Sequence, residues 1–391
     1  MEKVRIGIIG IGNMGSGHCN NITSGAVDGM ELTAVTDIKE TRIQWAKENL
    51  SQTVAVFDNA KELMESGLCD AVIIATPHYD HPGLAIQAFE HELHVMCEKP
   101  AGVYTKQVRL MNEAAGKYNL VFALMFNQRT NPVYRKMHEL VNNKTLGQIK
   151  RVNWIITDWY RTQAYYDSGD WRATWNGEGG GVLLNQCPHN LDLLQWICGM
   201  PSSVQAFCHN GKWHDIEVED DVTAYLTYPS GATGVFITTT GDAPGTNRLE
   251  ITLEKGKIVS ENNVLTLYEL EVNEREYCFK ATEGFKQPEG HFVNVSTEGN
   301  NPQHIGVLNA FAGNILHGTP LIADGTEGIN SLMLSNAMHL SSWLGRSVEL
   351  PVNEEMFLEE LNKKRCLSKQ KEKVKEQSFD TQNSYGSTIQ L

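Results

Sequence analysis

Short apolar runs alternate with helical segments over the first third of the chain. Six runs have the length of strands, at residues 4–9, 32–37, 54–57, 71–75, 94–98 and 120–124. Strands that are apolar along their whole length, with helices between them, are typical of a parallel sheet covered on both faces. We therefore expect residues 1–127 to form an α/β domain around a doubly wound parallel sheet.

The pattern changes after Asn127. We expect a helix over residues 132–142, followed by strands in which apolar and polar positions alternate, such as 149–160, 222–228 and 233–240. Alternation indicates a sheet with one buried face. Residues 128–362 are therefore predicted to form a C-terminal α+β domain with an open, mostly antiparallel sheet and helices on one face.

The second face of that open sheet needs a cover, and another copy of the chain would supply one. We accordingly expect a homo-oligomer, such as a dimer or a tetramer, that associates through this sheet. Residues 363–391 are polar, with many lysines and then serine, threonine and glutamine, and are predicted to be a solvated tail.

Composition narrows the class of protein. A formal net charge of −14 disfavours a nucleic-acid partner, because a phosphate backbone requires a concentrated basic surface. The sequence has no apolar run of membrane-spanning length and no secretory pattern at its start, so neither a membrane span nor export is expected. The eight cysteines form no CxxC pair, which favours reduced thiols in the cytoplasm and no metal site.

A glycine motif, Gly10-Ile11-Gly12-Asn13-Met14-Gly15, follows the first strand and opens a helix. This is the context that a dinucleotide-binding GxGxxG motif requires in a Rossmann domain. The first glycine allows the tight turn, the second allows a pyrophosphate to approach, and the third allows helix and strand to pack closely. The motif, with Asn13 and Met14, is therefore predicted to bind a dinucleotide.

An aspartate at the end of the second strand, Asp37, indicates which dinucleotide is bound. It lies about 20 residues beyond Gly15, where a carboxylate accepts hydrogen bonds from the ribose hydroxyls and repels a 2′-phosphate. The sequence therefore predicts NAD rather than NADP as the cofactor. Arg42 is close enough in sequence to leave some tolerance of NADP open.

Two further segments carry candidate chemistry. Glu98-Lys99-Pro100 ends the fifth strand, at the edge of the sheet where ligands bind. A lysine beside a positively charged nicotinamide is expected to have a lowered pKa. In the run from Gly179 to Asp192, Pro188 fits the first position of a helix and places His189 in its first turn. The positive end of that helix favours the neutral imidazole.

With Ala75-Thr76-Pro77-His78, His81 and Asn127-Gln128-Arg129, these segments resemble the Gfo/Idh/MocA family, which includes glucose–fructose oxidoreductase and inositol dehydrogenase. The resemblance covers about residues 3–361. It implies an NAD-dependent oxidoreductase that transfers a hydride between a secondary hydroxyl of a sugar, glycoside or polyol and nicotinamide. It also implies that His189 is the general base and Lys99 its partner.

The resemblance implies further contacts. Cofactor contacts are expected at Thr76, Pro77, His78, His81, Glu98, Lys99 and Gln128, and substrate contacts at Trp171, Arg172, Asn185 and Asp192. Asn185 is a departure, since many dehydrogenases of the family carry aspartate there. Its amide can bind a substrate hydroxyl but adds no negative charge to raise the pKa of His189 or Lys99. Asp192 lies one helical turn after His189 and either orients it or is structural.

Aromatic residues are dense between residues 154 and 175, which contain four of the eight tryptophans. They suit the faces of a sugar ring, and equally the packing of the sheet or a subunit interface. Some similar enzymes oxidise a glycoside at C3, which makes glycoside 3-dehydrogenation our specific hypothesis. An NAD-dependent glycosidase with transient oxidation, a non-catalytic sugar or NAD sensor, and a reductase of keto sugars or imines remain alternatives.

Overall fold

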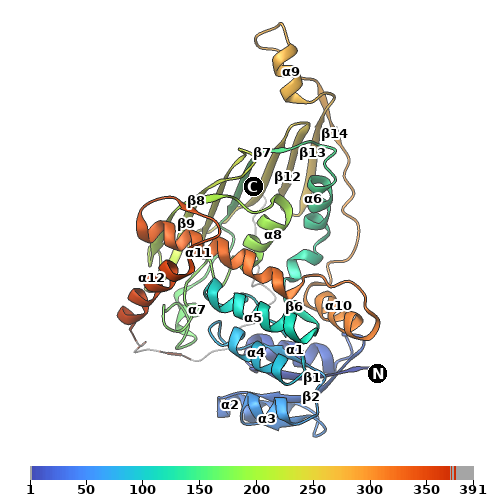
Figure 1. The fold of residues 1–391 in the computed structure, drawn as a ribbon, viewed down its shortest axis with the longest axis vertical. Helices are drawn as coiled ribbons and strands as arrows, with labels where there is room; N and C mark the ends of the chain where they lie inside the picture. The colour runs from blue at the N-terminus through green and yellow to red at the C-terminus, as the bar shows by residue number, and fades with distance from the viewer. Residues whose placement is uncertain (1, 370, 372–373, 376–391) are drawn as a thin grey trace.

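The computed structural model describes residues 2–369, 371, 374 and 375 of the chain. Two sheets organise it, one in each half of the chain (Figure 1). The first half contains the strands β1 (Val4–Ile9), β2 (Met30–Thr36), β3 (Ala55–Phe57), β4 (Ala71–Ile74), β5 (His94–Cys97) and β6 (Phe122–Leu124). Its helices are α1 (Asn13–Thr23), α2 (Glu40–Asn49), α3 (Ala60–Glu65), α4 (His81–Glu90) and α5 (Thr105–Tyr118).

All neighbouring strands of the first sheet are parallel, in the order β3-β2-β1-β4-β5-β6. This is the strand order of a Rossmann domain, and it confirms the predicted fold. Successive side chains of a strand point to opposite faces. Ile6 and Ile8 therefore pack with α1, whereas Val72 and Ile74 pack with α4. Both faces of the sheet are buried, which explains why its strands are apolar throughout.

The second half contains a nine-stranded sheet and most of the remaining helices. Its strands are β7 (Ile149–Ile156), β8 (Ser203–Asn210), β9 (Glu219–Thr227), β10 (Thr233–Thr239), β11 (Asn247–Leu253), β12 (Gly256–Glu261), β13 (Val264–Leu270), β14 (Gly290–Val293) and β15 (Val348–Glu349). The helices are η1 (Asn127–Thr130), α6 (Pro132–Asn142), α7 (Gln163–Asp167), α8 (Pro188–Cys198), α9 (Glu274–Lys280), α10 (Gln303–His317), η2 (Gly325–Glu327), α11 (Gly328–Leu344) and α12 (Glu354–Leu367).

The strands of this sheet run in the order β14-β13-β12-β11-β7-β10-β9-β8-β15, and the pair β7–β10 is parallel among otherwise antiparallel pairs. The helices α6, α8 and α11 cover one face, where Trp154 is buried (Figure 1). The other face exposes Ile155, Phe207 and Tyr225. The predicted open, mostly antiparallel sheet is confirmed, and association through its exposed face stays a prediction.

Two predicted boundaries are wrong by more than three residues, and the other strand ends differ by three residues or fewer. The strand expected over 149–160 ends at Ile156, and the chain then turns toward the cavity described below. The tail expected from Lys363 begins later, because α12 continues to Leu367. Asn353 caps this helix by accepting a hydrogen bond from the third residue beyond it, and buried Phe357 anchors its inner face. Residues 370, 372–373 and 376–391 of the predicted tail lie outside the described residues.

Helix α10 returns from the second half of the chain to the first sheet. Its Leu308 and Phe311 are buried in one cluster with Ile6 and Ile8 of β1. Part of the range predicted as the second domain therefore belongs, by its packing, to the core of the first. This return brings residues from beyond position 300 to the carboxyl ends of the strands of the first sheet.

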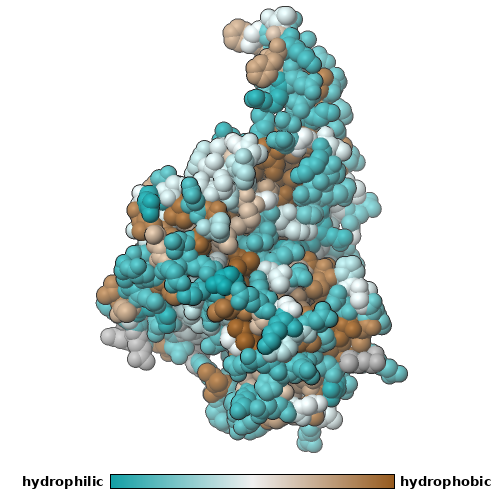
Figure 2. All heavy atoms as spheres, viewed as in Figure 1, coloured by the Kyte–Doolittle hydropathy of each residue, from teal (hydrophilic) through white to brown (hydrophobic). Residues whose placement is uncertain are grey.

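An arm formed by α9 and the segment leading to β14 extends from the end of the second sheet (Figure 1). Figure 2 shows a mostly hydrophilic surface with apolar side chains at the tip of this arm, where Phe279 and Phe285 are exposed. Within the described part of the chain, none of the helices combines the length and the apolar character that a membrane span needs.

Candidate active site

The carboxyl ends of β1, β2, β4 and β5 open onto a cavity of about 870 Å³. Segments of the second half, between residues 159 and 189, form its opposite wall. Most of the residues predicted from the sequence line this one cavity: Gly10, Gly12, Asn13, Met14, Asp37, Thr76, Pro77, His78, His81, Glu98, Lys99, Trp171, Arg172, Asn185 and His189. The strand ends of a doubly wound sheet are where such folds bind their ligands.

The glycine turn forms one end of the cavity. Gly10 has φ +91°, a conformation that side chains rarely adopt. A Cβ atom on Gly15 would lie 1.9 Å from the main-chain oxygen of Gly10, so helix and strand pack as closely as predicted. Helix α1 begins at Asn13, and no side chain of the described residues caps its first turn. Its first N–H groups are thus suited to the pyrophosphate of a dinucleotide.

Asp37 lies where a ribose would follow the pyrophosphate. Its carboxylate accepts one hydrogen bond from the N–H of Ile11 at 2.7 Å and another from the N–H of Lys39 at 2.9 Å. These bonds fix the carboxylate between the glycine turn and α2, at the wall of the cavity. Its remaining acceptor positions suit ribose hydroxyls, and its charge disfavours a 2′-phosphate. The residues present therefore fit NAD.

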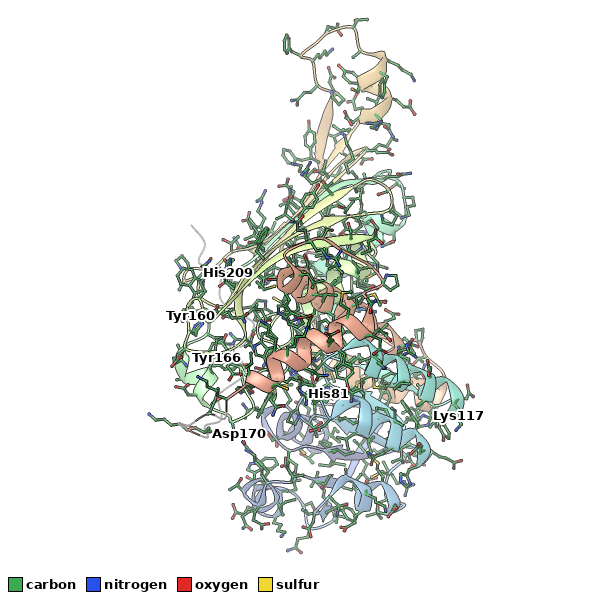
Figure 3. The ribbon with its side chains drawn as sticks, turned by 60° about the vertical axis from the view of Figure 1, so that its left-hand side comes forward. His81, Lys117, Tyr160, Tyr166, Asp170 and His209 are labelled. Atoms are coloured by element: carbon green, nitrogen blue, oxygen red, sulfur yellow. The ribbon has the colours of Figure 1, made fainter. Side chains whose placement is uncertain are left out.

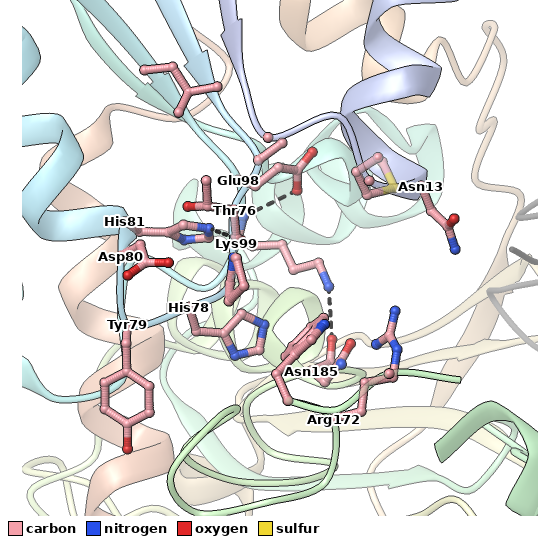
Figure 4. Close-up of a pocket in the computed structure, with 18 of the residues that line it drawn as sticks. Asn13, Thr76, His78, Tyr79, Asp80, His81, Glu98, Lys99, Arg172 and Asn185 are labelled. Atoms are coloured by element: carbon pink, nitrogen blue, oxygen red, sulfur yellow. Dashed lines mark hydrogen bonds between the residues drawn. The ribbon is translucent and has the colours of Figure 1, made fainter. Parts of the chain in front are cut away.

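Lys99 reaches across the cavity from the end of β5. Its Nζ donates a hydrogen bond of 2.9 Å to the main-chain oxygen of Asn185 (Figure 4). Burial lowers the pKa of Lys99, while the charge of neighbouring Glu98 opposes this change. The predicted lowering therefore has a cause in the protein itself, before any charge on a nicotinamide is considered.

His189 is the second residue of α8, as the sequence predicts, and only 5% of it is exposed. Burial lowers its pKa well below the usual range, and the charge of Lys99 lowers it further. The imidazole is therefore neutral at neutral pH and able to accept a proton. The helix dipole suggested the same state from the sequence, but burial is the larger cause in the folded protein.

Three predicted residues do not line the cavity. Gly15 lies behind the turn and acts through packing. Gln128 donates a hydrogen bond to Gln303 at 3.3 Å instead. Asp192 is buried and accepts hydrogen bonds of 2.8 and 2.7 Å from Arg129. Its carboxylate thus joins α8 to η1, which corrects the expected substrate contact and the suggestion that it orients His189.

Apart from the exposed Tyr160, the aromatic residues between 154 and 175 divide into two groups. Trp154, Tyr166 and Trp175 are buried in the core, whereas Trp159, Tyr165 and Trp171 line the cavity. The guanidinium of Arg172 lies over Tyr165 and Trp171, 4.8 and 4.6 Å from the ring centroids. In Figure 3, Tyr160, Tyr166 and Asp170 follow one side of the molecule from the sheet down toward the first domain. Packing therefore accounts for the buried residues, and contact with a sugar ring stays a prediction for those that line the cavity.

Two histidines were missed by the sequence analysis. His18 of α1 pairs with Glu98 at 2.7 Å. Burial raises the pKa of Glu98, but the hydrogen bond and charge of His18 outweigh it and lower the pKa to about 2. His304 of α10 lines the cavity, and burial lowers its pKa to about 4. Neither had a local signal, because only the fold brings α1 and α10 to the strand ends.

A buried carboxylate was also missed. Glu178 accepts hydrogen bonds from the main-chain N–H of Ala173 and from the side-chain amide of Asn185. Its position directly before Gly179-Gly180-Gly181 was a usable signal, because a charged residue beside a tight glycine run is held close to its neighbours. Within the described residues, no group of three or more His, Cys, Asp or Glu side chains is arranged to hold a metal ion.

Comparison with known proteins agrees with this geometry. Residues 4–126 match the model of an oxidoreductase family with an NAD-binding Rossmann fold, and residues 134–259 match the Gfo/Idh/MocA C-terminal domain. On this fold, one cavity combines a site suited to a dinucleotide with a lysine and a histidine. These features define an NAD-dependent oxidoreductase. The chain belongs to the Gfo/Idh/MocA family.

Several relatives match along most of their length. Myo-inositol 2-dehydrogenase of Thermotoga maritima is 27% identical and covers 89% of this chain and 98% of its own. D-glucoside 3-dehydrogenase of Escherichia coli K12 is 24% identical, with the same coverage of both chains. The WlbA dehydrogenase of Bordetella pertussis, solved with NADH and UDP-GlcNAcA, has a TM-score of 0.76 at 25% identity and covers 90% of this chain and 99% of its own.

Proposed function

We propose that this protein transfers a hydride between a secondary hydroxyl of a sugar, glycoside or polyol and the nicotinamide of NAD. The observation that carries the proposal is that Lys99 and His189 line the same cavity as the glycine turn and Asp37. Two relatives that match most of the chain are named for the oxidation of an inositol and of a glucoside, which supports a ring hydroxyl as the reacting group.

The residues of the cavity have different roles in the reaction. NAD would be held by the main chain around Gly10 and Gly12 and by Asp37, and it supplies the hydride acceptor when bound. The neutral imidazole of His189 is suited to take the proton of the substrate hydroxyl. The ammonium of Lys99 is suited to donate a hydrogen bond to that oxygen as negative charge develops on it. Both directions of the reaction use the same two groups.

Within this class, we propose glycosides oxidised at C3 as the substrates. Trp159, Tyr165 and Trp171 line the cavity, and aromatic side chains suit the C–H face of a pyranose ring or an aromatic aglycone. The similarity to D-glucoside 3-dehydrogenase over most of both chains favours this position on the ring. A ketone at C3 acidifies the hydrogen at C2, so the product would be ready for cleavage of its glycosidic bond by elimination.

The test is to incubate the protein with NAD and a panel of free sugars, inositols, and O- and C-glycosides, and to analyse the compounds by mass spectrometry. Loss of two hydrogens from glucosides, with the ketone located at C3 by deuterium exchange at both C2 and C4, is the expected result. Mass spectrometry detects the oxidised sugar even when the cofactor stays bound. The variant Lys99→Met, which keeps the length of the side chain, is the inactive control.

Other results of this experiment would indicate a different function. Turnover of inositols alone would overturn the glycoside proposal and leave a polyol dehydrogenase. Release of an aglycone without an oxidised sugar would identify a glycosidase that oxidises its sugar transiently. Complete absence of turnover, with NAD binding verified by calorimetry, would contradict the dehydrogenase and favour a sensor.

A further inference from the structure

A single acidic residue, Glu178, contacts both walls of the cavity. It is buried, with 2% of its surface exposed. One carboxylate oxygen accepts a hydrogen bond from the side-chain amide of Asn185, and the other accepts one from the main-chain N–H of Ala173. Its main-chain oxygen accepts a hydrogen bond of 3.2 Å from Nδ1 of His78, on the opposite wall. Glu178 is thus held at both ends of the residue.

The hydrogen bonds of Glu178 are those that an ionised carboxylate accepts. The N–H of Ala173 and the Nδ2 group of Asn185 are donors only, so both carboxylate oxygens act as acceptors. Burial raises the pKa of Glu178 above its usual value, although the charge of Arg172 and these two hydrogen bonds limit the rise. The arrangement therefore suits a buried negative charge directly behind Asn185.

The same asparagine is also bound by Lys99, whose ammonium donates to its main-chain oxygen at 2.9 Å. Lys99 and Glu178 therefore approach Asn185 together, one at the main chain and one at the side chain. We propose that Glu178 is a positioning residue that supplies, from behind Asn185, the negative charge facing the Lys99 ammonium. The inference rests on the proposed function, in which Lys99 interacts with the reacting oxygen.

The hydrogen bond also fixes what Asn185 can offer to a substrate. Because its Nδ2 group is directed at Glu178, its Oδ1 atom is the acceptor left for a hydroxyl in the cavity. An amide oriented in this way accepts a hydrogen bond, as a carboxylate at position 185 would. The pair of Asn185 and Glu178 thus separates two properties, an acceptor oxygen and a negative charge, that one aspartate would combine.

Other charged groups surround Lys99 and Glu178 and also act on their pKa values. The charged and titratable groups acting on Lys99 or Glu178 are Glu98, Arg161, Arg172, Lys371, His78, His189, His304 and Tyr166. Burial lowers the pKa of each of the three imidazoles, so they are neutral at neutral pH. Glu98 and Glu178 are therefore the carboxylates that oppose the arginines around Lys99.

The first measurement is the pKa of Lys99 in the intact protein with Glu178→Gln. Lys99 is partly exposed, so an amine-specific reagent reaches it, and peptide mass spectrometry gives its labelled fraction at each pH. Removing a nearby opposite charge favours the neutral amine. We expect the pH of half-labelling to fall by about one pH unit. An unchanged labelling profile would overturn the proposal.

The matched control is Asp170→Asn. Asp170 lies in the same segment between α7 and α8 as Glu178. Its side chain is 63% exposed, and it is not among the residues that line the cavity. The substitution removes one negative charge, as Glu178→Gln does, from a solvated position. The labelling profile of Lys99 should stay as in the wild type. An equal shift in both variants would mean that Lys99 senses only net charge, and would contradict a specific role of Glu178.

The decisive variant moves the charge rather than removing it. In the double variant Glu178→Gln/Asn185→Asp, the carboxylate lies at position 185 and the amide at position 178. We expect Glu178→Gln to lower kcat with little change in KM. In the double variant, kcat should recover and the labelling profile of Lys99 should return toward the wild type. If Glu178 only stabilised the segment around Asn185, neither the labelling profile of Lys99 nor kcat would recover.

Asn185→Asp alone covers the case in which Glu178→Gln does not fold. Two carboxyl groups in contact share a proton, and they titrate as a pair. The labelling profile of Lys99 should then show a second ionisation that the wild type lacks, and its absence would overturn the proposal. Labelling requires neither sugar nor turnover, so a negative result with the sugar panel and a negative result here are distinguishable.

Discussion

Lys99 donates its hydrogen bond of 2.9 Å to the main-chain oxygen of Asn185, across the boundary between the two halves of the chain. Lys99 follows β5 of the first sheet, whereas Asn185 lies in the segment that leads into α8. The bond therefore fixes the lysine relative to His189, which lies four residues after Asn185 as the second residue of α8. Neither half alone contains the pair, so we expect the site to depend on the docking of both.

Lys99→Met should abolish most of the turnover without loss of the cofactor. Methionine keeps the length and the apolar stem, but it cannot donate to the developing oxyanion, and we expect kcat to fall by ~10²–10⁴-fold. NADH binding, measured by fluorescence titration, should be retained because Gly10 and Asp37 are unchanged. Lys106→Met, at a surface ion pair with Glu355, is the control and should leave turnover intact. Equal losses in both variants would contradict a specific role.

Asp37→Ser should relax the choice of cofactor. Serine removes the charge that opposes a 2′-phosphate, and Arg42 lines the same cavity and is placed to attract that phosphate. The ratio of the Kd for NADPH to that for NADH should fall by about tenfold or more, which corresponds to ~1.4 kcal/mol. Isothermal titration with both dinucleotides measures it. An unchanged ratio would mean that other residues select NAD.

The sequence predicted what depends on local pattern. The strands of the first sheet, the turn at Gly10 and the start of α8 at Pro188 follow from runs, glycines and a proline that are adjacent in the chain. Asp192 shows the limit, because its position after His189 was visible but its buried partner, Arg129, is 63 residues away in sequence. Pairing between distant residues leaves no local trace in one sequence.

The same limit explains the two histidines that the sequence did not indicate. His304 reaches the cavity only because α10 packs on β1 through Leu308 and Phe311, far from it in sequence. Glu178 was overlooked for a different reason. The absence of an aspartate at position 185 was read as a missing charge, whereas the folded chain provides a carboxylate from another position. Residues that compensate for one another become visible only when their contacts are known.

Gly15→Ala tests the close approach of helix and strand. The added Cβ atom would lie 1.9 Å from the main-chain oxygen of Gly10, so the backbone itself must move. We expect a loss of about 1–3 kcal/mol in the free energy of unfolding, together with weaker NAD binding. Gly17→Ala is a matched control on the same helix, because, apart from its chain neighbours and the nearby backbone of the helix, no atom of the described residues lies within 4 Å of its Cβ position. Thermal unfolding of both variants should separate them.

Acid stability should depend on Glu98. Its pKa in the folded protein is about 2, below the ordinary value of 4.5, so its ionised form stabilises the fold above pH 4.5 and this contribution is lost as the pH falls toward 2. In Glu98→Gln, the free energy of unfolding should therefore fall less steeply between pH 4.5 and 2. Urea unfolding over this range measures the slope. Glu90→Gln, at an exposed position at the end of α4, should keep the wild-type slope.

Asp192→Asn separates a structural role from a catalytic one. Arg129 and Asp192 are both buried, and Asp192→Asn leaves the charge of Arg129 without its buried partner, which costs about 3–5 kcal/mol. Arg129 also pairs with Glu327, whose side chain is 41% exposed, and Glu327→Gln should cost no more than ~1 kcal/mol. The pH dependence of kcat should be the same in the wild type and in folded Asp192→Asn, because Asp192 bonds to Arg129 rather than to His189. If Asp192→Asn kept its stability but lost turnover, the result would indicate that Asp192 orients His189.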